Sequence, residues 1–128
     1  MQLQTDTLLL ALLLFQLKHF VCDFLLQSYA TISKKGIYLH PVGLAHAGIH
    51  AIGSLPALLV LTHAPTPIIE LMAAEFVVHY HVDWLKANVD KWFKLDTTKY
   101  AYWAIFGADQ LAHQLTYIAM TYAIVRLG

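Results

Sequence analysis

The sequence has few cysteines and few charged residues. Its single cysteine, Cys22, excludes an internal disulfide bond. Only 12% of its 128 residues are charged, against about 25% in a typical soluble domain. Its 8 basic and 8 acidic residues cancel, so the basic footprint of a nucleic-acid-binding protein is absent, and we predict no nucleic-acid partner.

Several familiar catalytic motifs are also missing. Neither Glu70 nor Glu75 is followed three residues later by histidine, as it would be in a ferritin-like di-iron bundle. The zinc-protease motif His-Glu-x-x-His, a phosphate-binding glycine loop and the nucleophile elbow of hydrolases are absent. The opening residues MQLQTD lack the basic region that begins a signal peptide, so we expect the first apolar segment to be retained.

Apolar residues, by contrast, make up 59% of the chain, against about 45–50% in a typical soluble domain. They form segments of about 20 residues or more, which as helices can cross a hydrocarbon core of about 30 Å. Four such spans can be drawn, at residues 5–29, 40–62, 67–88 and 99–127. We therefore predict an all-α fold, an integral membrane four-helix bundle with up-down-up-down connectivity. Residues 1–128 would form a single four-span transmembrane domain.

The positions of the lysines predict an orientation in the lipid bilayer. The first and third connecting segments carry lysines in or beside them, and the second carries none. By the positive-inside rule, the lysine-rich loops are cytoplasmic and both termini face outward. A soluble helical bundle is the less favoured alternative, because apolar residues surround these segments instead of forming one stripe. The lysines are Lys34, Lys35, Lys86, Lys91, Lys94 and Lys99.

Histidine and acidic residues recur four positions apart in every predicted span. Residues at this spacing lie on one helical face, one turn apart. Counted from the lysine-rich ends, they lie at depths of roughly 10–18 Å, at 1.5 Å per residue, so the four helices can bring them into one layer. The residues are His19 and Asp23; His46 and His50; Glu75, His79 and Asp83; and Asp109 and His113.

Such a layer predicts a metal site. An aspartate at the centre of a membrane helix costs roughly 2.5–3.5 kcal/mol on insertion scales, and coordination of a cation satisfies it. The 9 candidate ligands exceed the roughly four to six positions around one transition metal, so we predict one or two ions per chain, of zinc, iron or manganese. Glu75 is the predicted general base or an additional ligand. The predicted ligands are His19, Asp23, His46, His50, His79, Asp83, Asp109 and His113.

Four stretches carry a resemblance to a known family. They are HFVCDFLLQ with a downstream lysine (Lys34 or Lys35), HAGIH, HYHVDWLK and DQLAH. In this order, and over nearly the whole chain, they resemble small bacterial membrane proteins catalogued as domain of unknown function 3307. The resemblance implies a four-helix fold in a bacterial inner membrane and no particular activity. Near the ligands we further predict that Gln27, Lys86 and Gln110 support them or contact substrate; Lys18 has no assigned role.

The predicted function is that of a metal-dependent membrane hydrolase. A metal beside protonatable groups lowers the pKa of bound water and polarises a phosphoryl or carbonyl oxygen, and a lipid or small amphiphile could reach the site from the bilayer. A proton or divalent-metal transporter or channel is one alternative, since intramembrane histidine and aspartate mark such pathways. The mostly apolar outer halves of the spans favour a site open to one side only. A structural membrane subunit, whose polar layer fixes helix register, is the other alternative.

Overall fold

The computed structural model describes residues 4–127, and every regular element in that range is helical. The all-α class predicted from the sequence is therefore confirmed. The elements are α1 (Thr5–Phe20), the π-helix η1 (Val21–Leu25), α2 (Tyr29–Lys34), α3 (Pro41–Gly53), α4 (Leu55–Leu61), α5 (Pro65–Trp92) and α6 (Tyr100–Leu127).

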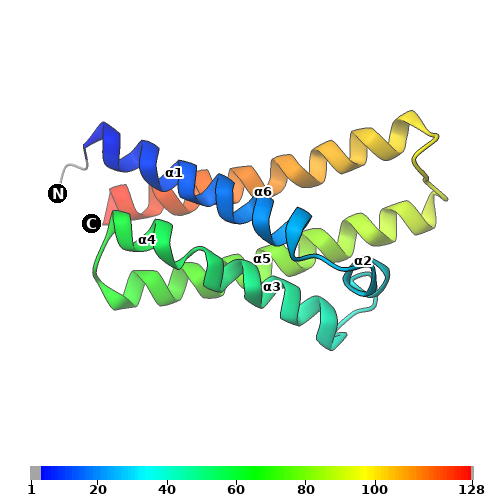
Figure 1. Ribbon diagram of the computed structural model, residues 1–128, viewed down its shortest axis with the longest axis horizontal. Helices are drawn as coiled ribbons and strands as arrows, with labels where there is room; N and C mark the ends of the chain where they lie inside the picture. The colour runs from blue at the N-terminus through cyan, green and yellow to red at the C-terminus, as the bar shows by residue number, and fades with distance from the viewer. Residues whose placement is uncertain (1–3, 128) are drawn as a thin grey trace.

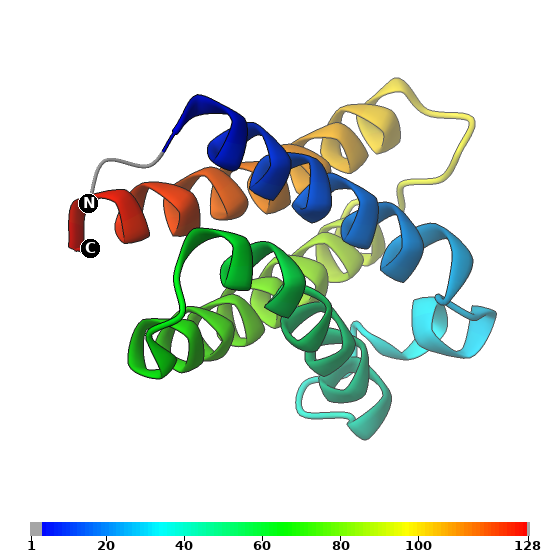
Figure 2. The ribbon, with the colours of Figure 1, turned by 60° about the vertical axis from the view of Figure 1, so that its left-hand side comes forward.

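The chain runs back and forth along the long axis of the molecule (Figure 1). α1 and η1 run toward the end where α2 lies, α3 and α4 return, α5 runs forward again and α6 returns. α1 packs beside α4 and α6, α3 beside α5, and α5 beside α6. The connections that carry most of the lysines lie at one end, and the α4–α5 connection lies at the other (Figure 1, Figure 2). The helices are thus arranged up-down-up-down.

The first helix ends earlier than predicted. It is α-helical to Phe20, continues as a π-helix to Leu25 and then breaks, so the predicted end at Tyr29 is wrong. Ser28 begins the next helix, α2, because its Oγ accepts a hydrogen bond from the backbone N–H of Thr31 at 3.3 Å. This is the usual role of an N-cap serine, and it separates α2 from the apolar segment before it.

The second predicted helix is divided at Ser54, where α3 ends and α4 begins. Pro56 explains the division, because proline has no backbone N–H and its ring collides with the carbonyl of the preceding turn. α3 itself begins at Pro41, at a first-turn position that tolerates proline. The bend expected at Pro56 is therefore present as a break two residues before it, at Ser54.

The third helix, α5, continues past the predicted end at Asn88 to Trp92. The loss of apolar residues after Asn88 suggested the end of a span, but helix formation does not require apolar side chains. Lys86 and Asp90, one turn apart on this polar section, form an ion pair of 2.7 Å, which stabilises a partly buried helical turn. α6 begins at Tyr100, close to the predicted start of its span.

The apolar core fills the half of the bundle opposite α2. Phe15 and Tyr117 stack face to face there, with ring centroids 5.0 Å apart, and Leu58 and Leu61 of α4 are fully buried beside them. Burial of each such side chain stabilises the fold by about 1.5–3 kcal/mol. The polar layer described below lies on the α2 side of this core.

Two helical stretches, Thr5–Leu25 and Pro41–Leu61, have the length and apolar composition to cross a membrane. Within residues 4–127, α5 and α6 do not meet the same criterion, so the sequence prediction of four spans is not reproduced. Charged side chains explain the difference in α5, which carries Glu70, Glu75, Asp83 and Lys86 along its length. Two such stretches also occur in soluble helical cores, so they are weak evidence for a membrane location.

Candidate metal centre

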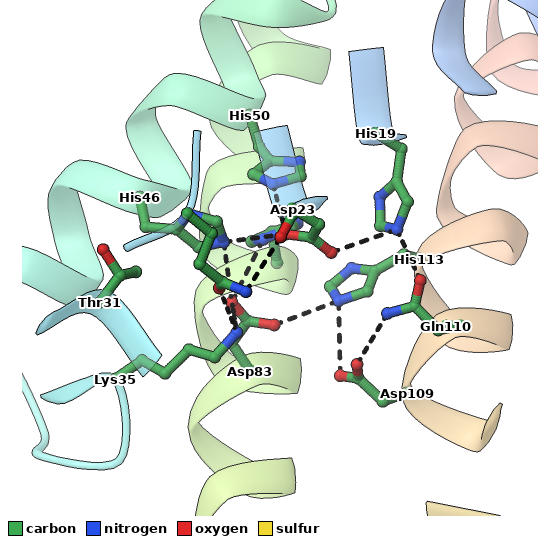
Figure 3. A network of polar contacts seen from close by, with 12 residues as sticks. His19, Asp23, Thr31, Lys35, His46, His50, Asp83, Asp109, Gln110 and His113 are labelled. Atoms are coloured by element: carbon green, nitrogen blue, oxygen red, sulfur yellow. Dashed lines mark hydrogen bonds and ion pairs between the residues drawn. The ribbon is translucent and has the colours of Figure 1, made fainter. Parts of the chain in front are cut away.

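Asp23 is the first of two carboxylates around which the polar layer is built. It lies in the π-helix η1 and is buried. Its Oδ1 lies 3.1 Å from Nε2 of His46 and 2.9 Å from Nε2 of His50, both on α3. Its Oδ2 lies 3.2 Å from Nε2 of His19 (Figure 3). Helical spacing alone explains the His19 contact, because the two residues are one turn apart.

Asp83 of α5 is the second carboxylate. Its Oδ2 lies 3.3 Å from Nε2 of His46 and 3.4 Å from Nε2 of His79. Its Oδ1 lies 3.3 Å from Nε2 of His113 on α6 (Figure 3). His46 thus lies between the two carboxylates, and η1, α3, α5 and α6 all contribute to one connected layer.

Within the described chain, these side chains form two groups that could hold metal ions. In each group the ligand atoms lie within 4.8 Å of one another. His79 belongs to both, and its ring stacks between those of His50 and His113, with centroid distances of 3.8 and 4.2 Å. The first group is Asp23, His46, His50 and His79; the second is His79, Asp83 and His113.

The donor atoms of these groups could hold a transition metal. Ligand atoms around one tetrahedral zinc lie about 3.3–3.6 Å apart, given bonds of about 2.0–2.2 Å, and the contacts of Asp23 and Asp83 are close to this range. Among the described residues, Nε2 of His46 and both ring nitrogens of His79 are buried and make no hydrogen bond, although the two Nε2 atoms lie 3.1–3.4 Å from carboxylate oxygens. Buried polar atoms normally have partners, and a cation would provide one.

His19 and Asp109 flank the two groups. Nε2 of His19 lies 2.9 Å from Oε1 of Gln110, and its Nδ1 lies 3.0 Å from the hydroxyl of Tyr117. Oδ1 of Asp109 lies 3.5 Å from Nε2 of His113, and its Oδ2 accepts a hydrogen bond from Gln110 at 3.1 Å. The structure therefore brings both predicted ligands to the layer but outside the two compact groups.

Glu75 has a different environment from the other predicted site residues. Its carboxylate forms an ion pair with Lys18 and accepts a hydrogen bond from Ser54, and it is almost completely buried. Lys18 also donates to the backbone carbonyl of His50 at 3.0 Å and lies 4.5 Å from the centre of the Tyr117 ring. Glu75 thus lies outside both ligand groups, and Lys18, unassigned from the sequence, is its partner.

Of the three supporting residues predicted from the sequence, two are connected to the polar layer and one is not. Gln110 contacts two of the flanking side chains, as described above. Gln27 accepts a hydrogen bond from Nζ of Lys35 at 2.8 Å, and the same Nζ lies 3.2 Å from Asp83. Lys86 is paired with Asp90 and does not contact the ligand groups. Gln27 thus acts through Lys35, which the sequence offered only as one of two lysines.

Two residues of the site were missed in the sequence, Ser54 and Tyr117. Tyr117 lies one turn beyond His113 and continues the stripe that begins at Asp109, so the spacing contained a signal for it. Ser54 gave no such signal, because its position depends on the break before Pro56. A break in a helix moves side chains off the regular periodicity.

The chain belongs to the family described as protein of unknown function (DUF3307), whose model matches residues 8–128. This confirms the resemblance recognised in the sequence. Comparison with curated proteins and with solved structures gave no match. The family carries no assigned activity, so a function has to be inferred from the site itself.

Proposed function

We propose that this protein is a metal-dependent hydrolase embedded in a membrane, with one or two divalent ions between its helices. The observation that carries the proposal is the pair of buried ligand groups joined by His79. Imidazole and carboxylate together suit zinc, iron or manganese. A bound ion of this kind polarises an ester oxygen and activates water for attack.

Exposed apolar side chains support the membrane location. Large residues on the outer faces of the long helices are about half exposed, among them Leu13, Ile69, Leu111 and Ile118. A soluble monomer rarely leaves so much apolar surface in contact with water, whereas a bilayer covers it. In this setting the lysine-rich end faces the cytoplasm.

Asp109 is the proposed proton acceptor in this reaction. Its Oδ1 lies 3.5 Å from Nε2 of His113 but makes no hydrogen bond among the described residues, and its side chain lines a cavity that also reaches Asp23. A general base must lie within reach of the reacting water, and the position of Asp109 on the cavity wall supports this role. Glu75, predicted as the base from the sequence, has both oxygens occupied by Lys18 and Ser54.

The metal content of purified variants tests the site. Because His79 belongs to both groups, we expect His79→Ala to lose both ions and Asp83→Asn to lose the ion of its own group, from about two per chain in the wild type. His81→Ala is the matched control, since His81 is exposed on the same helix. Elemental analysis of detergent-purified protein measures this, with circular dichroism to confirm folding. A folded wild-type protein without metal would refute the proposal.

Removal of the metal should also lower the thermal stability. An ion that binds only the folded state stabilises it by about 2.7 kcal/mol at one hundred times its dissociation constant. We therefore expect a chelator to reduce the melting temperature of the wild type and to leave His79→Ala unchanged. Differential scanning fluorimetry in detergent measures both, and equal shifts in the two proteins would contradict the assignment.

A transporter is less well supported by the packing. Transport requires a polar route through both ends of the bundle, but the half beyond the ligand layer is closed by Phe15, Leu58 and Leu61. Metal uptake into proteoliposomes that depends on His79 would favour the transporter over the hydrolase.

A further inference from the structure

A polar cavity of about 120 Å³ lies beside the ligand layer, on the side where α2 lies. Asp23, Asp109 and Gln110 line its inner part. Lys35, in the turn after α2, and Lys86 of α5 also line it. Phe24 and Ile32, which also line it, are exposed at the molecular surface. The cavity therefore connects the candidate metal centre to an apolar outer rim.

The cavity lining carries two lysines and two carboxylates, Asp23 and Asp109, and each lysine is paired with a further carboxylate. The lysine side chains are 13% and 16% exposed for Lys35 and Lys86. Lys35 pairs with Asp83, a proposed metal ligand, so a bound metal would compete with Lys35 for this carboxylate. Lys86 pairs with Asp90 and lies 4.6 Å from the centre of the Tyr102 ring. A metal held by Asp23 and Asp83 would use both carboxylates as ligands and would leave the ammonium group of Lys35 free to contact an anion in the cavity.

We propose that this cavity binds the phosphate group of an amphiphile whose apolar part lies against Phe24 and Ile32. The inference rests on the proposed function and names its substrate class. Lysine is a common phosphate ligand, and a phosphate monoester carries about 1.5 to 2 negative charges at neutral pH. A metal on Asp83 would take this carboxylate from Lys35, and a phosphate would then supply an anion to both the metal and Lys35, with Lys86 beside them.

The reaction that follows is hydrolysis of the phosphate monoester. Water attacks phosphorus, and the bond from phosphorus to the alcohol oxygen breaks with its electron pair on that oxygen. Asp109 takes a proton from the water and returns it to the leaving alcohol oxygen, so the products are inorganic phosphate and the alcohol. No oxidant or reductant takes part.

Binding measurements with a lysine variant test this inference. Lys86 is the residue to change, because it contacts none of the proposed metal ligands. We expect the protein in nanodiscs to bind phosphatidic acid at least tenfold more tightly than phosphatidylcholine, and Lys86→Met to weaken the binding of phosphatidic acid about tenfold, the effect of 1.4 kcal/mol. Lys86→Arg, which keeps the charge, should retain it. Lys91→Met is the control, since Lys91 is exposed on the same helix.

The outcomes separate this inference from the proposed function. If Lys86→Met and Lys86→Arg both bind phosphatidic acid like the wild type, the inference is wrong even where the metal content is normal. If inorganic phosphate binds as tightly as phosphatidic acid, the ligand is free phosphate and the amphiphile is excluded. A metal-free wild type would refute the hydrolase, while lysine-dependent binding of phosphatidic acid by that same protein would still support the cavity.

Discussion

At the residue scale, Lys18 shows how a side chain that looks misplaced in an apolar helix acquires a function. Its ammonium group contacts the Glu75 carboxylate and the carbonyl of His50, and it lies over the Tyr117 ring. Glu75 also accepts a hydrogen bond from Ser54. Lys18, Glu75 and Ser54 thus connect α1 and α5 with the end of α3. Because Lys18 donates to the backbone carbonyl of His50, this group of buried side chains positions His50.

Breaking this ion pair should destabilise the protein strongly. Removal of one partner leaves an uncompensated buried charge, which costs about 3–5 kcal/mol. We expect Lys18→Met to lower the free energy of unfolding by this amount. The double variant Lys18→Met with Glu75→Leu should recover part of the loss, because it leaves no charge behind. Chemical unfolding in detergent measures the effect, and a single variant as stable as the wild type would show that the pair is not formed.

At the scale of the elements, two irregularities determine where the site residues lie. The π-helix η1 carries Asp23, and π-helical turns often occur at functional sites. The break between α3 and α4 places Ser54 beside Glu75. If the chain were regular α-helix through η1 and Ser54, the helices would match the predicted spans, but Asp23 and Ser54 would make different contacts.

Gly107 provides a test of helix packing at the same scale. It lies within α6, and a methyl group built there would meet no atom within 4 Å. Glycine in a helix is about 0.5–1 kcal/mol less favourable than alanine. We therefore expect Gly107→Ala to raise the free energy of unfolding by that amount without changing metal content. A destabilised variant would show that another surface packs closely against α6 at this point.

At the scale of the whole molecule, the charges and the polar site lie toward one end and the apolar core toward the other. α2, the polar cavity and most of the lysines share one end, and the α4–α5 connection marks the opposite end (Figure 1). In the proposed orientation, the opening of the cavity would lie at the cytoplasmic interface, where an anionic amphiphile would present its head group.

The membrane orientation can be tested with single cysteines in a Cys22→Ala background. The positive-inside rule places Lys34 in the cytoplasm and His63 outside. We expect an impermeant thiol reagent added to intact cells to label His63→Cys and not Lys34→Cys, with the reverse in inverted vesicles. Gel-shift of the labelled protein measures this. Labelling of both from one side would contradict the orientation, and release of the protein without detergent would contradict the membrane location.

The sequence by itself determined the helical class and the stripes of histidine and aspartate. Both follow from local geometry, since residues four apart share a helical face whatever the helix packs against. It also identified the family. The depths of His46, His79 and His113 along their helices also predict that they lie in one layer, because the rise per residue fixes the height of each residue along a helix.

The tertiary structure alone decided how these stripes meet. The spacing of residues within one helix determines the direction of each side chain around the helix axis. It does not determine which neighbouring helix that side chain faces. The structure therefore assigned Asp23 and Asp83 as the two centres of the layer, paired Glu75 with Lys18 instead of leaving it free as a base, and revealed Lys35 beside Asp83. These contacts join residues distant in sequence, so only the packing of the helices could establish them.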